Sequence, residues 1–508
     1  MSKFGLDQVS QSIELTGPSN SARVLAALRL AHGQAAMSTV RERRELGRAA
    51  RATRPRSGLA DFTPAAGRKD PVEVLLAQEL DREMALTPLR HRRMAASAFA
   101  FYRGSAAIMA ADLGTVPTTG LVTWLCGDAH VANFGLFAAP DRSIVFDVND
   151  FDETSPGPFE WDVMRLAASL VLACWENGAS DFKARQIVAA SVRGYREQMA
   201  IHAQQDNLDN WYARIDVGAL SKWAQAEGKS ARSTMRQAVA KAETRDAWSA
   251  LDKMTVLRGG RRQLIDQPPL ILPLALEGGV AHAVTEILAS YQETLPPDRV
   301  RLLERYHLVD IGHKVVGVGS VGLLAVVVLL QGRDANDLLV LQAKQAVSSA
   351  LEPYSGASVY SEHGQRVVVG QQLMQAASDP LLGWVTSPAG RSFYLRQLRD
   401  KKYSPDIARM KPKVLGDYAL LCGRALARAH ARAGDPIAIA GYLGNSSKFD
   451  EAMVGFGFSY ARQVRADFAD FTRAIADGRI RVGSAEQDRA LSLQVDESGK
   501  IVVNSGTV

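Results

Sequence analysis

Residues 126–153 decide the fold and read CGDAHVANFGLFAAPDRSIVFDVNDFDE. Asp128 and Asn133 lie on the first loop of this stretch, and Asp150 lies near its end. Between them, the apolar segments NFGLFA and SIVFDVND are joined by APDR, which is typical of a hairpin turn. We therefore predict two antiparallel strands that return Asp150 toward the loop carrying Asp128 and Asn133.

These residue types fit phosphoryl transfer. In that chemistry one carboxylate accepts or orients the proton of an attacking hydroxyl, while an amide oxygen and a second carboxylate hold Mg²⁺ against the phosphate chain. A loop with Asp and Asn, followed by a hairpin that returns another Asp, can place all three around one metal-phosphate site. Several acidic side chains compete as metal ligands, namely Asp147, Asp150, Asp152 and Glu153. We favour Asp150 because Phe151 follows it and the hairpin ends there.

The loop resembles the catalytic loop of the aminoglycoside and choline phosphotransferases, a branch of the protein-kinase-like superfamily. That loop reads His-Gly-Asp-x-His-x-x-Asn. Gly127, Asp128, His130 and Asn133 match it, and Cys126 stands where the branch usually has its first His. His130 either braces the loop by hydrogen bonding or touches substrate.

Two later segments extend this resemblance. Asp150-Phe151-Asp152 is similar to the metal-binding Asp-Phe-Gly element, with Asp152 in place of Gly. Asp162 resembles the acidic residue that opens the next helix and supports the catalytic loop from behind. The resemblance implies that Asp128 is the catalytic base, that Asn133 and Asp150 bind the metal, and that Asp162 is structural.

A glycine-rich segment lies far downstream and reads GVGSVG. Closely spaced glycines between two strands let backbone N–H groups approach phosphate oxygens. The strand that follows the next turn ends in Lys344, which resembles the lysine that pairs the α- and β-phosphates. Taken alone, the pattern also fits a glycine-rich hairpin and a surface lysine. The expected nucleotide contacts are Gly317, Gly319, Ser320, Gly322 and Lys344.

The lysine of such a site normally pairs with a carboxylate on the following helix. Glu362 is our candidate for this partner, and Glu352 is the alternative. Three further cations, Arg396, Arg399 and Lys401, face phosphate or substrate, or are solvated charges at a strand end.

The order of the motifs is reversed relative to an ordinary kinase, where the glycine segment and lysine come first. Either the glycine segment is a decoy, or the fold is circularly permuted. We favour permutation because LGDYALLCGRALARAHARAGD, after the β-rich segment, resembles the helix that runs into the catalytic loop. The predicted class is α+β, a two-lobed protein-kinase-like fold with a small β-rich lobe inserted late in a mainly helical lobe.

This organisation divides the chain into five parts. Residues 1–94 form an Arg-rich extension, and 95–310 form the helical catalytic lobe with the catalytic loop and the metal-binding hairpin. The remaining parts are the β-rich nucleotide-binding lobe at 311–412, the return to the helical lobe at 413–480, and a tail at 481–508.

Six segments together resemble a bacterial family catalogued as domain of unknown function 2252. They are FAFYRG, CGDAHVANFG, FDVNDFDE, GVGSVG, LQAK and LRQLRDKK. The resemblance implies a kinase-like fold and brings no established substrate.

Composition sets the remaining limits. Apolar residues make up 47% of the 508 residues and charged residues 22%, which excludes a disordered or fibrous chain. A net charge of +6 permits anionic ligands and does not require nucleic acid. Arginines cluster at 41–56, as a solvated arm or as an arm that contacts anions or nucleic acid. No signal-like N-terminus and no membrane-length apolar run is visible, so we expect a cytoplasmic protein without a membrane partner.

The expected activity is an ATP- and Mg²⁺-dependent transfer of a phosphoryl group to a hydroxyl of a small molecule that the sequence does not identify. Alternatives are a kinase-fold enzyme that modifies protein, by phosphorylation or AMP transfer, and a non-catalytic nucleotide-binding protein. The Gly-Asp-x-His pattern also occurs in binuclear metallophosphoesterases. That chemistry needs many metal-binding side chains, whereas the nine histidines of this chain are scattered.

Overall fold

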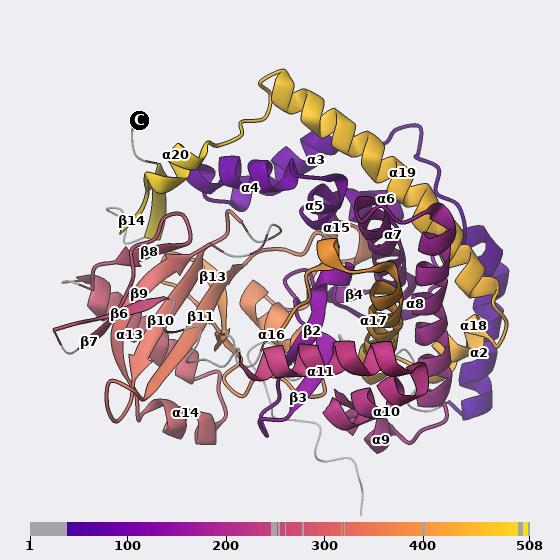
Figure 1. Ribbon diagram of the computed structural model, residues 1–508, viewed down its shortest axis with the longest axis horizontal. Coiled ribbons are helices and arrows are strands. Elements are labelled where there is room, and N and C mark those ends of the chain that lie inside the picture. Colours follow the sequence, from indigo (N-terminus) through magenta and orange to yellow (C-terminus); the bar gives the residue numbers. More distant parts are fainter. Residues whose placement is uncertain are drawn as a thin grey trace, which may run out of the picture.

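The computed structural model of the chain describes residues 38–244, 251, 254–259, 261–276, 279–315, 317, 319, 321–398, 402–495 and 501–505. Helices and antiparallel sheets are mixed along the chain (Figure 1), which confirms the α+β class. No helix in the described ranges is long and apolar enough to cross a membrane.

A six-stranded sheet occupies the left of Figure 1, and every neighbouring pair of strands is antiparallel. Its spatial order is β12-β13-β11-β10-β9-β8. In chain order the strands are β8 (Ile271–Leu274), β9 (His307–Lys314), β10 (Ala325–Gln331), β11 (Leu338–Ala346), β12 (Gly383–Thr386) and β13 (Ser392–Gln397). The sheet thus begins with β8, ahead of the expected lobe boundary at residue 311.

Both faces of the sheet are buried, which explains the uninterrupted apolar run in β10. Val326 and Val328 point into one hydrophobic cluster, and Val327 and Leu329 point into another, because successive side chains of a strand face opposite sides. The first cluster includes residues of α13 (Gly279–Gln292), α14 (Pro297–Leu303), β14 (Leu491–Val495) and β15 (Ile501–Ser505). The second includes Leu264 of the hairpin formed by β6 (Thr255–Arg258) and β7 (Arg261–Leu264).

Long helices on the right of Figure 1 form the other part of the molecule. The principal ones are α7 (Glu160–Glu176), α8 (Asp181–His202), α17 (Pro412–Ala433), α18 (Pro436–Leu443) and α19 (Lys448–Ala476). Helices α8 and α17 approach closely because Gly194 and Gly423 lie where they meet. At Gly423 a Cβ atom would stand 1.9 Å from the carbonyl oxygen of Ser191.

Short elements surround this helical part. The shorter helices are α3 (Pro71–Gln78), α4 (Thr87–Met94), α5 (Ala98–Arg103), α6 (Ala106–Leu113), α9 (Asn207–Tyr212), α10 (Val217–Glu227), α11 (Lys229–Glu243), α15 (Glu352–Ser355), α16 (His363–Met374) and α20 (Ala485–Arg489). Two small sheets join segments near the loop of residues 126–133, and their strands are β1 (Val122–Leu125), β2 (Phe134–Ala138), β3 (Ile144–Val148), β4 (Ser155–Pro158) and β5 (Ile215–Asp216). The pairing of β2 with β3 confirms the predicted hairpin.

The arginine-rich segment contacts the helical part rather than standing apart from it. Helix α2 (Val40–Thr53) packs against α18. Arg43 forms an ion pair with Asp435 at 2.7 Å, and Arg51 donates hydrogen bonds to the carbonyls of Tyr442 and Gly441. The C-terminal ends of helices expose unpaired carbonyl oxygens, which cations satisfy. Arg51 therefore caps the C-terminal end of α18, whereas Arg43 pairs with Asp435, the residue that caps its N-terminal end.

Candidate active site

One cavity of about 810 Å³ brings together residues from distant parts of the chain. Asp128, Asn133 and Asp150 line it from the loop and the hairpin, and Lys344 lines it from β11. Gly317, from the glycine-rich segment, lines it as well. The structure thus places the two predicted groups of site residues around a single space.

The loop before Asp128 is fixed by its backbone. Gly127 has a φ of +80°, a region that strains other residues, and a Cβ atom there would stand 2.1 Å from the carbonyl oxygen of Glu153. Asp162, at the start of α7, accepts hydrogen bonds from the backbone N–H groups of Cys126 and Gly127 at 2.8 and 3.1 Å. Asp162 therefore braces the loop from behind, as the resemblance implies.

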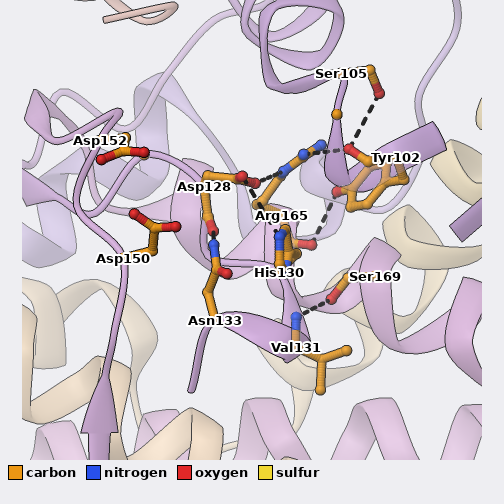
Figure 2. Close-up of polar contacts among 12 residues, drawn as sticks. Tyr102, Ser105, Asp128, His130, Val131, Asn133, Asp150, Asp152, Arg165 and Ser169 are labelled. Atoms are coloured by element: carbon orange, nitrogen blue, oxygen red, sulfur yellow. Dashed lines mark hydrogen bonds and ion pairs between the residues drawn. The ribbon is translucent and has the colours of Figure 1, made fainter. Parts of the chain in front are cut away.

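Asp128 makes an ion pair with Arg165, whose Nε lies 2.8 Å from the Asp128 Oδ1 atom (Figure 2). Arg165 lies on α7, also donates to the carbonyl oxygen of Tyr102, and packs its guanidinium over the Tyr102 ring at 3.7 Å. Burial raises the pKa of Asp128 above its ordinary value, and Arg165 opposes that rise. The carboxylate is thus held in one orientation, with its Oδ1 atom occupied by Arg165.

The other loop residues take different positions. Asn133 donates from Nδ2 to the carbonyl oxygen of Asp128 at 2.8 Å, which fixes the orientation of its amide. His130 lies with Nε2 3.7 Å from the Asp128 Oδ2 atom. Burial, and then the nearby charges of Arg103 and Arg165, hold the pKa of His130 well below its ordinary value. The Nδ1 atom of His130 has no hydrogen-bond partner within the described structure, so bracing by hydrogen bonding is not seen, and the residue lines the cavity.

The structure separates the four acidic candidates of the hairpin. Asp147 is buried and paired with Arg428 of α17 at 2.5 Å. Glu153 accepts a hydrogen bond from the backbone N–H of Ala350 at 2.6 Å. Neither lines the main cavity.

Asp150 and Asp152, which precede and follow Phe151 in the chain, both lie near Lys344. The Asp152 Oδ2 atom is 2.6 Å from the Lys344 Nζ atom, and its Oδ1 atom accepts from the Tyr394 hydroxyl at 2.6 Å. The Asp150 Oδ1 atom is 3.8 Å from the same Nζ atom, is buried, and makes no hydrogen bond within the described structure. Burial, and then the Asp152 charge, raise the pKa of Asp150.

The prediction that Glu362 pairs with Lys344 is wrong. Glu362 accepts hydrogen bonds from the Trp384 indole and the Thr386 hydroxyl instead, at 2.9 and 2.7 Å. Glu352 accepts from the backbone N–H of Ser349 and lies 3.4 Å from Arg366. Asp152 is instead the nearest carboxylate partner of Lys344, at 2.6 Å, and Asp150 lies farther away at 3.8 Å.

The glycine-rich segment is only partly at the cavity. Gly317 and Gly319 line it, and Ser320 lies outside the described residues. Gly322 does not line the cavity. It has a φ of +97° and packs against Arg82, whose guanidinium donates to the carbonyl oxygen of Val321 at 2.6 Å. Position 322 therefore needs glycine because the backbone turns there against Arg82, and not because it approaches the cavity.

Positive charge dominates the cavity wall. Among the described lining residues, three carboxylates face seven cations, which are Arg93, Arg103, Arg142, Lys314, Lys344, Arg396 and Lys402. Such a wall favours a polyanionic ligand. Arg396, one of the cations left open by the sequence, lines the cavity, whereas Arg399 and Lys401 lie outside the described residues.

Sequence reasoning missed Arg165 and Arg103. Arg103 belongs to the FAFYRG segment, and nothing in that segment indicates that this arginine lines the site. Arg165 follows Asp162 by three residues on α7, so both lie on one helix face. This spacing could have identified Arg165, because a residue that shares a helix face with Asp162 can also reach the Asp128 loop.

The site also fits a divalent cation bound together with phosphate. Within the described ranges, no group of three or more His, Cys, Asp or Glu side chains could hold a metal by itself. Mg²⁺ is usually held by one or two carboxylates plus substrate phosphates. Asp150, with its unbonded buried oxygen, and the amide of Asn133 match that smaller requirement.

Comparison with known proteins gives one match. A family model described as an uncharacterized protein conserved in bacteria (DUF2252) covers residues 82–474, a span that includes both Asp128 and Lys344. No curated protein and no solved structure matches the chain. Since the family model covers well over half of the 508 residues, the chain belongs to the bacterial DUF2252 family.

Proposed function

We propose that the protein is an ATP- and Mg²⁺-dependent phosphotransferase with a circularly permuted, kinase-like arrangement, acting on a hydroxyl of a small molecule. The observation that carries the proposal is the shared cavity. Asp128, Asn133 and Asp150 from the helical part meet Lys344 and Gly317 from the sheet part there, although the sequence separates them widely. A phosphotransferase needs this set of groups around one phosphate chain.

The proposed roles follow from the contacts of each side chain. Arg165 occupies the Asp128 Oδ1 atom, so the Oδ2 atom is the one available to orient a substrate hydroxyl and to hold its proton. The raised pKa of Asp128 brings it closer to the operating pH, which suits a proton acceptor. Asn133 and Asp150 would hold Mg²⁺, and Lys344 would hold phosphate oxygens. Bound ATP and Mg²⁺ would supply the transferable group and neutralise its charge.

The permuted order has structural support at two places. Lys344 lies on β11, an interior strand of the sheet, and the neighbouring strand β10 follows the glycine-rich segment. Helix α17 follows the sheet in the chain and packs against β1, which leads into the Asp128 loop, and against β3 of the hairpin that follows the loop. The chain therefore leaves the helical part, builds the sheet and returns.

Thermal-shift and turnover measurements test this function. We expect ATP with Mg²⁺ to stabilise the full chain, and ATP turnover to require Asp128. Asp128→Asn should keep nucleotide binding and lose roughly 10²–10⁴-fold in turnover, since it removes general-base chemistry. Asp298→Asn, which changes an exposed carboxylate on α14, is the matched control and should behave as wild type.

The reaction products identify the transferred group. Release of ADP supports phosphoryl transfer, whereas release of pyrophosphate would replace the proposal with AMP transfer. Absence of any Mg²⁺-dependent stabilisation by ATP would overturn the nucleotide-binding part.

A further inference from the structure

A second, smaller cavity of about 170 Å³ lies between α8, α10 and α17. We propose that it binds a small organic anion, through a carboxylate or phosphate head group. None of the described residues that line it also lines the main cavity. The inference therefore does not depend on the proposed phosphotransferase activity.

Arg428 provides the anchor of this cavity. Its side chain is only 2% exposed, and its Nη2 atom donates to Asp147. Its Nε and Nη1 atoms are buried and have no hydrogen-bond partner within the described structure. A buried donor without a partner costs free energy, and the cost is larger for a charged group. An anion in the cavity would satisfy these donors.

The surrounding charge favours an anion over a neutral ligand. Arg214 and Arg424 also line the cavity, and no described lining residue is a carboxylate. Arg214 forms ion pairs with Asp141 at 3.0 Å and Asp216 at 3.7 Å, whereas Arg424 has no ion pair among the described residues. Burial lowers the pKa of His202, which disfavours its charged form. Arg424 thus supplies a cation without an ion pair, beside the unpartnered donors of Arg428.

The rest of the wall defines the other end of the ligand. Ile215 and Leu421 are apolar, and the ring of Trp223 completes this side. The Trp223 Nε1 atom is buried without a hydrogen-bond partner and offers a further donor. Pockets of this kind bind ligands by an apolar body with a few placed polar groups. A volume of about 170 Å³ limits the ligand to a short apolar body on one anionic head.

Trp223 supplies a local optical signal for the test. The full chain is titrated with butyrate, butyl phosphate and uncharged butanol while tryptophan fluorescence is recorded. We expect a saturable change with at least one of the two anions and none with butanol. The better anion reports whether the head group is a carboxylate or a phosphate. Trp223→Phe should remove the signal, which places the ligand beside this ring.

Charge variants complete the test. Arg424→Ala should weaken binding about tenfold or more, the scale of a charge-assisted hydrogen bond. Arg193→Ala removes an exposed arginine from α8 and should leave the affinity unchanged. Arg428→Lys keeps the charge for Asp147, loses the orphan donors and should also weaken binding. Failure of both anions to saturate, or an unchanged affinity in Arg424→Ala, would overturn the proposal.

Discussion

At the scale of single residues, Lys344 shows how the sheet and the hairpin are joined. Its ammonium contacts Asp152 at 2.6 Å and Asp150 at 3.8 Å, and Tyr394 of β13 holds the other Asp152 oxygen. Burial disfavours the charged forms of Asp152 and Lys344, but their attraction outweighs it. Lys344 and Tyr394 lower the pKa of Asp152. Asp150 and Asp152 raise the pKa of Lys344. The charged pair is therefore the stable form.

Replacing Asp152 should affect both stability and nucleotide binding. Asp152→Asn leaves the buried Lys344 with one weaker carboxylate partner, so the free energy of unfolding should fall by about 3 kcal/mol. Affinity for ATP with Mg²⁺ should also fall, because Lys344 loses its position. Denaturant unfolding and nucleotide titration measure the two effects.

Glu362→Gln is the control for this prediction, because it makes the same chemical change at the carboxylate first expected to pair with Lys344. Glu362 contacts Trp384 and Thr386 instead, so nucleotide affinity should be unchanged. A larger loss of nucleotide affinity in Glu362→Gln than in Asp152→Asn would refute the assignment.

The residues of the site were predictable where chemistry and local spacing agreed. Asp128, Asn133 and Asp150 could be selected because a loop and a hairpin bring them together within one short segment. The pairing of Asp147 with Arg428 joins residues 281 positions apart, so no local pattern could remove Asp147 from the metal candidates. The prediction for Glu362 failed for a related reason, since helix α16 begins at His363 and the Glu362 carboxylate contacts Trp384 and Thr386 of β12, which follow it in the chain.

At the scale of elements, the contact between α8 and α17 depends on glycine. Gly423 and Gly416 lie on the same helix, but only Gly423 meets the backbone of α8, where a Cβ atom would stand 1.9 Å from the Ser191 oxygen. At Gly416 the nearest atom would be the Ile187 side chain, at an ordinary 3.6 Å. One helix therefore offers a matched pair of positions.

Alanine at these two positions should have opposite effects. Gly423→Ala should destabilise by about 3 kcal/mol or more, because two backbones must separate and buried contacts are lost. Gly416→Ala should be neutral or stabilise by up to about 1 kcal/mol, since alanine favours the helix. Thermal unfolding of both variants checks this, and equal destabilisation at the two positions would show that the close approach is absent.

Strands with a strong local sequence pattern were predictable, but the strands and helices that they pair with or pack against were not. The continuous apolar run of β10 is typical of a buried strand, and the structure explains it by two covered faces. Nothing local indicates that β8 joins the same sheet, or that Leu491 and Leu493 from the tail pack on it. These pairings are set by long-range packing, which a single sequence does not record.

At the scale of the whole molecule, the main cavity lies where the sheet and the helical part meet. Its positive wall is assembled from both parts, including Arg103 of α5, Lys344 of β11 and Arg396 of β13. The sequence order of the motifs is reversed relative to a kinase, but their meeting in one space depends on the fold and not on that order. The proposed circular permutation would explain how the site residues meet although their order in the chain is reversed.

A crystal structure of the chain with a non-hydrolysable ATP analogue and Mg²⁺ tests this claim most directly. We predict the terminal phosphate between Asp128 and Lys344, with Mg²⁺ on Asn133 and Asp150 and with Gly317 and Gly319 beside the phosphates. An analogue bound outside this cavity, or phosphates lying more than about 10 Å from both Asp128 and Lys344, beyond any catalytic contact, would contradict it.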